Sequence, residues 1–497
     1  MRTVAGPTDH VVVVGAGLAG LSTALRLAGA GRAVTVCEQR EAPGGLAGRL
    51  EVGGYQLDTG PTVLTLPEVA ADAMAAVGEQ LTDWVTLVRL DPGYRATFAD
   101  GSVLPVRADP EATAEEIARV CGPAEAAGYR RFVDRITELY RLQLPTVIAR
   151  NLDGLTDLDP AVLTRLAFLG GFRRLDRLVG RYLRDRRTRR LFTFQSLYVG
   201  VPPQRALAAY AVVTYMDTVA GVYFPIGGMH ALPAALAGAA AKHGVDIEYR
   251  TRVARVETRG RRAVAVHTAA GERIPADVVV ITADPALGYP DLLPALPPPR
   301  RLRRRRPSPS CFVLVRGGPS SAPEPAHHTI HFGAGWSSTM REIVDRGQLM
   351  SDPSLLVSSP TVTDPGLAPA GRAVHYLLAP APTLGAGLDW TVVGPRYRDE
   401  LLARLRRLGH PDLELPAEAE VTFTPADWRA AGGADGSPFG AAHTLGQTGP
   451  FRLPTLPAGG ADNVLFAGAG VQPGIGVPMA LLSGRLAAER ITGAGLR

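Results

Sequence analysis

The chain has 497 residues, roughly three times the length of a typical single domain, so we expect a molecule built from several parts. Its composition of 46% apolar and 20% charged residues allows a large core and excludes a disordered, collagenous or coiled-coil chain. The net charge of +6 is small for this length and gives no reason to expect a nucleic-acid partner.

The sequence carries no pattern typical of export, membrane insertion or disulfide formation. Its three cysteines have no CxxC or Cys/His spacing, which fits a reducing compartment and predicts neither disulfides nor a zinc site. The first ten residues do not form a charged and then apolar leader. Two long uncharged windows, 218–241 and 463–484, are interrupted by glycine and proline, so we expect neither to span a membrane. We therefore expect a cytoplasmic protein.

The first predicted unit is a strand, a glycine turn and a helix, which is typical of dinucleotide-binding domains. A buried strand at 11–14 leads into Gly15, Gly17 and Gly20, which form GxGxxG. These glycines permit a tight turn, a close approach of the backbone to a pyrophosphate, and close packing of helix on strand. A second strand ends at Glu38, where a carboxylate can accept hydrogen bonds from a ribose diol. The alternative is a glycine turn without a ligand, but the surrounding strands, helix and acid favour a dinucleotide.

A second glycine-rich turn follows directly and narrows the choice of cofactor. The segment 43–49 reads PGGLAGR, so it combines a second possible phosphate contact at Gly45 with a cation at Arg49. An NAD site does not normally need this second turn. The pattern therefore favours FAD.

The segment 38–69, which includes the element DTGPT, resembles the amino-terminal signature of the carotenoid desaturase family, in particular the bacterial-type phytoene desaturases. The segment 463–491, NVLFAGAGVQPGIGVPMALLSGRLAAERI, is similar to the closing flavin motif of that family. Three segments between these ends also match in order: 196–213, 221–236 and 276–285. One departure concerns the family's Thr-His pair, where this chain has Val471 and Gln472.

The resemblance implies an α/β (α+β) fold of the amine-oxidase type, with a discontinuous Rossmann-type FAD-binding domain, a mixed-sheet substrate domain and a helical lid. The expected segments are 1–60, 220–299 and 460–497 for the FAD-binding domain, 61–110 and 300–459 for the substrate domain, and 111–219 for the lid. The expected FAD contacts are Gly15, Gly17, Leu18, Ala19, Gly20, Glu38, Gly45, Arg49, Val253, Gly470, Gly476 and Val477. The expected substrate contacts are Pro61, Thr62, Phe224 and Gln472.

The segment 161–192 in the predicted lid has the most unusual charge pattern in the chain. Arginines alternate there with apolar residues at helical spacing, which predicts a basic amphipathic helix able to lie on an anionic membrane. The alternative is a surface helix whose apolar side covers the protein core. A second arginine cluster, 300–306, follows a proline run and is interpreted as a linker or a second lipid-facing loop. These patterns predict peripheral contact with the inner face of the cell membrane.

The sequence gives no candidate for a catalytic residue and no metal site. His327, His328 and His331 form HHxxH, but the run alternates like a strand, so two of the side chains face away from the third. No motif typical of a hydrolase or protease is present. The aromatic residues of the lid are interpreted as core residues or as the lining of an apolar channel.

The resemblance implies desaturation of a long apolar isoprenoid, most directly phytoene, in repeated steps of carotenoid biosynthesis. FAD would accept a hydride, a neighbouring proton would leave, and oxygen or a membrane quinone would accept the electrons. The alternatives are an amine oxidase, a desaturase of dehydrosqualene or of a hydroxycarotenoid, and a prenyl-lipid-binding protein of the same fold without redox activity.

Overall fold

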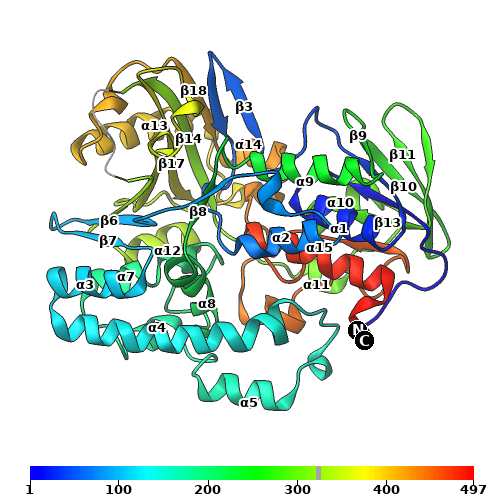
Figure 1. The fold of residues 1–497 in the computed structure, drawn as a ribbon, viewed down its shortest axis with the longest axis horizontal. Coiled ribbons are helices and arrows are strands. Elements are labelled where there is room, and N and C mark those ends of the chain that lie inside the picture. The colour runs from blue at the N-terminus through cyan, green and yellow to red at the C-terminus, as the bar shows by residue number, and fades with distance from the viewer. Residues whose placement is uncertain (321–325, 497) are drawn as a thin grey trace.

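The computed structural model describes residues 1–320 and 326–496, and its first layer is a five-stranded parallel sheet in the order β19-β13-β1-β2-β9. Its strands are β1 (His10–Val14), β2 (Ala33–Cys37), β9 (Asp246–Glu248), β13 (Val278–Ile281) and β19 (Val464–Phe466). They come from three stretches of sequence that lie far apart in the chain. Both ends of the chain lie beside this sheet, next to each other (Figure 1).

The runs of buried valine in these strands explain why both faces of the sheet are covered. Val11 and Val13 pack under helices, whereas Val12 packs on the opposite face. The helices on the first face are α1 (Leu18–Gly29), α2 (Pro67–Ala75), α9 (Ala231–Lys242) and α15 (Val477–Thr492). The opposite face is covered by the small sheet β10 (Val253–Arg259), β11 (Arg262–Thr268) and β12 (Arg273–Pro275), and by α10 (Pro285–Leu292).

A mixed seven-stranded sheet in the order β18-β14-β17-β16-β15-β6-β7 forms the second layer. Its strands are β6 (Tyr94–Phe98), β7 (Val103–Val106), β14 (Ser310–Pro319), β15 (His328–Phe332), β16 (Leu355–Ser358), β17 (Arg372–Ala381) and β18 (Ala419–Phe423). The pair β15 and β6 is parallel and joins the early strands to the late ones. The helices α12 (Ser337–Asp345), α13 (Trp390–Arg407) and α14 (Pro425–Ala430) flank it. Two antiparallel pairs complete the strands: the hairpin of β3 (Arg49–Val52) with β4 (Tyr55–Asp58), and the long-range pair of β5 (Leu87–Arg89) with β8 (Tyr223–Pro225).

Helices form a third part, which lies below the large sheet in Figure 1. They are α3 (Pro110–Cys121), α4 (Pro123–Gln143), α5 (Pro160–Phe168), α6 (Leu175–Val179), α7 (Arg186–Leu191) and α8 (Ala211–Tyr215), which continues into a π-helical turn, η6 (Met216–Ala220). Asp109, Asp159 and Asp185 each accept an amide hydrogen bond at the start of α3, α5 and α7. Aspartate caps of this kind explain where these helices begin.

The prediction of one amphipathic helix over 161–192 is wrong. Three short helices occupy this segment, because Gly170 adopts a left-handed conformation after α5 and Asp185 caps a new helix. The apolar side chains of Leu175, Leu178 and Leu183 are fully buried in the main core. The alternative interpretation, an apolar side that covers the protein core, therefore holds for 175–183.

The second arginine cluster is part of the folded structure. The short helix α11 (Arg300–Arg303) lies within it. Arg301 donates to the carbonyls of Pro450 and Arg452, and Arg305 pairs with Asp435 at 2.6 Å. These contacts tie the cluster to the chain around residue 450 rather than leaving it as a free linker.

Within residues 1–320 and 326–496, no helix is both long enough and apolar enough to cross a bilayer.

Candidate cofactor and substrate cavity

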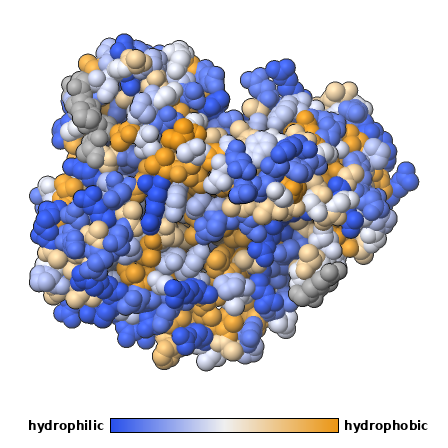
Figure 2. Space-filling model, in the orientation of Figure 1, coloured by the Kyte–Doolittle hydropathy of each residue, from blue (hydrophilic) through white to orange (hydrophobic). Residues whose placement is uncertain are grey.

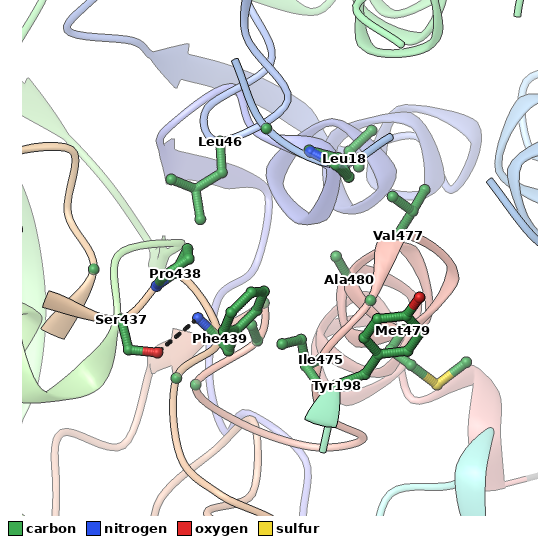
Figure 3. A pocket seen from close by; sticks show the side chains of 18 of the residues that line it. Leu18, Leu46, Tyr198, Ser437, Pro438, Phe439, Ile475, Val477, Met479 and Ala480 are labelled. Carbon is green, nitrogen blue, oxygen red and sulfur yellow. Dashed lines mark hydrogen bonds between the residues drawn. The ribbon is translucent and has the colours of Figure 1, made fainter. Parts of the chain in front are cut away.

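One cavity of about 890 Å³ connects the parallel sheet, the large mixed sheet and the helical part. Segments from both ends of the chain line it, including the glycine turn after β1 and the start of α15. Figure 3 shows Leu18 and Leu46 on one side, and Val477, Met479 and Ala480 of α15 on the other. A volume of this size falls in the range of pockets for cofactors and small molecules.

The glycines after β1 have three different roles. A Cβ atom at Gly15 would lie 2.2 Å from the Thr282 hydroxyl oxygen, and one at Gly20 would lie 2.1 Å from the Gly15 carbonyl oxygen. Both positions therefore require glycine for packing, and Gly20 itself does not line the cavity. Gly17 has no non-neighbouring atom within 3.8 Å of its potential Cβ position, because the nearest is the Gly45 Cα at 3.9 Å. The backbone at Gly17 is thus open to a ligand.

The amino terminus of α1 faces the cavity without a side-chain cap. The helix begins at Leu18 after Gly17, and Leu18 and Ala19 line the cavity. The first N–H groups of a helix have no partner within the helix and carry the positive end of its dipole. This end of α1 is suited to bind a phosphate group.

Glu38 lies at the end of β2 with its carboxylate buried against the cavity. The side chain is 4% exposed, and its oxygens accept hydrogen bonds from the Ala16 N–H at 2.8 Å and the Arg40 N–H at 2.9 Å. A carboxylate has about four acceptor positions, so two remain for a ribose diol. Val253, at the start of β10, lines the same end of the cavity.

The second glycine turn packs directly on the first. The Gly44 N–H donates to the Ala16 carbonyl at 2.9 Å, and Gly45 lines the cavity opposite Gly17. The cation at this turn is Arg40, whose guanidinium donates to the Gly45 carbonyl at 2.6 Å.

Arg49 does not belong to this group, which corrects the sequence-based expectation. Its side chain pairs with Glu51 at 2.6 Å and with Gln56 at 3.0 Å along the β3–β4 pair. It does not line the cavity. The expected position fails because β3 begins at Arg49 and turns its side chain toward its own hairpin.

The carboxyl-terminal motif forms the opposite wall, with Gly470, Gly476 and Val477 in the lining. Gly476 has a φ of 115°, which favours glycine and turns the chain into α15. Gln472 also lines the cavity; its amide donates to the Leu152 carbonyl at 2.8 Å and accepts from the Leu152 N–H at 3.2 Å. The side chain that replaces the family's histidine therefore ties this loop to the helical part.

A fully buried arginine holds the same loop from behind. The Arg452 guanidinium donates to the carbonyls of Val471 at 2.9 Å, Ala469 at 2.5 Å and Ala441 at 3.2 Å. Burial lowers the pKa of Arg452 to about 10. Sequence analysis missed Arg452, since one arginine among many carries no signal of burial.

The other half of the cavity is mainly apolar and aromatic. Its walls come from the helical part and the large sheet, and Pro61 and Thr62 are among the residues that line the cavity. Further lining residues are Phe194, Leu197, Tyr198, Val212, Val213, Met216, Phe332, Trp336, Leu356 and Tyr376. Phe224 is not in this wall: it is 1% exposed and packs on His327, with ring centroids 4.4 Å apart. The pairing of β8 with β5 directs Phe224 toward β15 instead.

One carboxyl group lies in this apolar half. Asp217, on the π-helical turn η6, is 5% exposed and lines the cavity. Burial raises the pKa of its carboxyl to about 8, and the neighbouring Tyr94 hydroxyl offsets part of this shift. Sequence analysis missed this residue, although a signal exists: Asp217 is the one formally charged residue between Arg205 and Lys242.

The three histidines of the HHxxH motif are buried at β15, outside the cavity lining. The His327 ring bonds to the Thr363 hydroxyl, His328 to the Ser358 hydroxyl, and His331 to His410 at 2.7 Å. In the described parts of the chain, no group of three or more His, Cys, Asp or Glu residues has the arrangement of a metal site. Burial lowers the pKa of His327 and of His331 to about 3.

The geometry fits an FAD molecule that spans the cavity. Two glycine turns leave room for a pyrophosphate, a helix amino terminus faces it, and Glu38 keeps free acceptor positions for a ribose. The start of α15 and the loop before it would hold the flavin end. The apolar half then lies next to the flavin.

The chain matches the family described as flavin containing amine oxidoreductase over residues 18–492. It is 54% identical to a phytoene dehydrogenase from Streptomyces griseus, over 99% of this chain and 97% of that protein. It is 38% identical to a zeta-carotene-forming phytoene desaturase from Myxococcus xanthus, over 97% of this chain and 93% of that protein. The solved structure of cyclohexylamine oxidase from Brevibacterium oxydans has a TM-score of 0.59 and 17% identity, over 98% of this chain and 99% of that one.

The last likeness is one of fold, and it confirms the predicted α/β architecture of the amine-oxidase type. The family match and the geometry of the cavity together confirm FAD as the cofactor and oxidoreduction as the class of reaction. The chain belongs to the flavin containing amine oxidoreductase family and is an FAD-dependent oxidoreductase.

Proposed function

We propose that this enzyme desaturates a long apolar isoprenoid, most directly phytoene, in repeated steps of carotenoid biosynthesis. The observation that carries the proposal is the cavity, which joins two glycine-rich turns to a mainly apolar, aromatic space. A polyene precursor has no polar handle, so such a space suits it better than a small amine. The names of the relatives from Streptomyces griseus and Myxococcus xanthus support the same substrate.

The chain's own residues would bind, orient and dehydrate the reactants. FAD, when bound, supplies a two-electron acceptor for a hydride from an allylic carbon. We propose that Gly15, Gly17, Leu18, Ala19, Glu38, Gly45 and Val253 hold its nucleotide half, and that Gly470, Gly476 and Val477 hold its flavin half. Pro61, Thr62 and Gln472 would contact the reactants, and the aromatic wall would exclude water from the reacting carbon.

The function is tested by producing the protein in cells that accumulate phytoene and recording absorption spectra of the extracted pigments. Each added pair of conjugated bonds should move the absorption bands to longer wavelength. The purified protein should carry a visible flavin absorption band. Cells whose phytoene remains unchanged, beside a protein loaded with FAD, would refute the substrate. A colourless protein that takes up no FAD would refute the redox activity itself and favour a prenyl-lipid-binding protein.

We also propose peripheral contact with a membrane, through α5 and its flanking turns rather than through a single long helix. Leu155, Phe168 and Phe172 in this region are 56%, 78% and 49% exposed. Apolar residues gather along the lower edge of the molecule in Figure 2, where α5 lies in Figure 1. Arg165 and Arg173 are exposed beside them. Apolar side chains surrounded by cations suit an anionic lipid surface. Oxygen or a membrane quinone would then reoxidise the flavin.

Sedimentation with liposomes tests this contact. Binding should be stronger to vesicles with anionic lipid than to neutral vesicles, and should weaken as salt rises. The double substitution Phe168→Asp and Phe172→Asp should reduce binding at least tenfold. A matched control is Val392→Asp, because Val392 is also exposed, at 48%, but lies on α13 of the other layer. Equal binding by all three proteins would exclude α5 as the contact surface.

A further inference from the structure

We infer that Asp217 is the proton acceptor of the desaturation and thus its catalytic base. This inference rests on the proposed function. It assigns a role to the one acidic residue that the helical part contributes to the described cavity lining. The other acidic lining residues are Glu38, which follows β2, and Asp284 and Asp291, at the start and in the last turn of α10.

The position of Asp217 is unusual for a carboxyl group. Asp217 is only 5% exposed, and it lines the cavity. Its Oδ2 atom has no hydrogen-bond partner among the described residues. It lies on η6, where the helix that begins as α8 widens into a π-helical turn. Such turns occur often at functional sites. A buried carboxyl oxygen without a hydrogen-bond donor costs stability, so the retention of this group in the cavity wall calls for a use.

The groups that face Asp217 are phenols and rings rather than cations. Tyr94 lies on β6, and Tyr198 follows the short 3-10 helix η4 (Phe194–Leu197). The negative charge of Asp217 adds to the effect of burial in raising the pKa of both phenols. The Tyr94 ring packs edge-on against Phe194 at 5.8 Å and lies 5.7 Å from the ring of His328 on β15. Burial lowers the pKa of His328 well below its usual range, so this ring is neutral at physiological pH. Within the described part of the chain, no salt bridge therefore holds Asp217 in its ionised form.

Asp217 lies at the flavin end of the apolar half. The segment that carries Tyr198 is bound to the carboxyl-terminal motif, because the Val199 carbonyl accepts the His443 N–H at 2.9 Å. His443 in turn touches Gly474, where a Cβ atom would lie 2.2 Å from the imidazole Nε2. Figure 3 shows Tyr198 in the wall with Ile475 and Met479. The carboxyl group and the predicted flavin position thus share one part of the cavity.

The chemistry balances with Asp217 as an ionised carboxylate. One C–H bond of the isoprenoid breaks with its electron pair, and this hydride reduces FAD by two electrons. The adjacent C–H bond breaks toward Asp217, which takes the proton, and the electron pair of that bond becomes the new C=C bond. The protonated Asp217 then returns its proton to solvent before the next step. A base with a pKa near the working pH is well matched to this task.

The test follows the reduction of bound flavin when oxidised enzyme is mixed without oxygen with phytoene in phosphatidylcholine vesicles. Asp217→Asn should slow reduction at least roughly 100-fold, the lower end of the contribution of a general base. Because the carboxylate form increases as pH rises, the wild-type rate should rise through an apparent pKa of about 8. This rise should vanish in Asp217→Asn and should move to a different pH in Asp217→Glu.

The matched control is Thr218→Val. Thr218 is the next residue on η6, is 2% exposed, and donates its hydroxyl back to the Thr214 carbonyl at 2.7 Å without lining the cavity. This variant should keep both the rate and the pH profile. A second readout needs no turnover: the infrared difference between wild type and Asp217→Asn should contain the carbonyl band of a protonated carboxyl that titrates with a pKa of about 8.

Three results would overturn the assignment: an Asp217→Asn enzyme that keeps the wild-type rate, a pH profile that persists in that variant, or no carboxyl band in the difference spectrum. If Asp217→Asn does not load FAD, the pH profile of Asp217→Glu decides, and an unchanged apparent pKa would overturn it. A wild-type enzyme that leaves phytoene unchanged would refute the proposed function. An active wild type beside an unaffected Asp217→Asn would refute the further inference alone.

Discussion

Buried charged residues are the most informative single positions in this molecule. Arg452 and Asp217 both lie within or behind the cavity wall, but their surroundings differ. Arg452 has backbone carbonyls around its guanidinium, whereas Asp217 has an unpartnered oxygen. A buried charged side chain whose hydrogen bonds are all made stabilises one conformation of the loop around it. A buried charged side chain that lacks a hydrogen-bond partner is a candidate for a catalytic or binding role.

Replacing Arg452 should loosen the flavin end of the cavity. In Arg452→Met the carbonyls of Val471 and Ala469 lose their donor, and each buried unsatisfied group costs roughly 1–3 kcal/mol. We expect the free energy of unfolding to fall by at least roughly 2 kcal/mol, and the dissociation constant for FAD to rise at least tenfold. Denaturant unfolding and flavin fluorescence titration measure the two quantities.

Arg303→Met provides the control for that substitution, because Arg303 is exposed on α11. It should change neither stability nor FAD affinity by a measurable amount. If Arg452→Met were as stable as Arg303→Met, the carbonyl contacts of Arg452 would not hold the loop.

The positions of the glycines and of the acid at the end of the second strand could be predicted from the sequence, because they depend on the conformation of the local backbone. Gly15, Gly17 and Glu38 lie where the strand–turn–helix pattern places them. Arg49 and Phe224 do not line the cavity, because the direction of a side chain on a short strand depends on the partner strand. Sequence spacing carries no information on that partner.

Whole helices and strands were predictable where the spacing of apolar residues along the sequence matched the side of the element that packs on the core. The alanine-rich run 231–242 has the composition of a helix and forms α9, and the alternating run from Val253 to His267 forms the antiparallel pair β10 and β11. The segment 161–192 had helical periodicity but broke into three helices. The helical segment is interrupted because Gly170 has a left-handed conformation and Asp185 caps a new helix. Such local turn and cap residues outweigh a regular spacing of apolar residues.

The contact between α1 and α15 gives a prediction at the level of elements. These helices approach so closely that a Cβ atom at Gly484 would lie 2.4 Å from the Ala19 carbonyl oxygen. Gly484→Val should therefore push the helices apart and displace the first turn of α1. We expect a loss of roughly 1–3 kcal/mol in the free energy of unfolding and weaker FAD binding.

Gly446→Val serves as the control for this helix contact. A Cβ atom at Gly446 meets nothing within 4 Å, and its φ is not in the left-handed region. Thermal unfolding of both variants, with and without added FAD, separates a packing effect from a general cost of losing glycine. Equal behaviour of the two variants would show that the α1–α15 contact does not limit stability.

At the scale of the whole molecule, the central design is a nucleotide sheet assembled from three distant stretches of chain. The order of these stretches was visible as separate buried strands, but their pairing was not, because parallel strands are joined through long connections. The family resemblance implied that the three stretches belong to one domain, but not how their strands pair. The large sheet is also built from strands that are distant in the chain, since β6 and β15 pair although more than 200 residues separate them.

Strand β19 forms one edge of the nucleotide sheet, and it follows the other four strands of that sheet in the chain. A ribosome makes the chain from its amino terminus, so the first four strands of this sheet emerge before the long segment between β13 and β19 is synthesised. During that time the edge of β13 that later pairs with β19 is open to other chains. Chaperones that shield nascent strands, and an ample supply of flavin at release, should therefore raise the yield of this enzyme in a recombinant host.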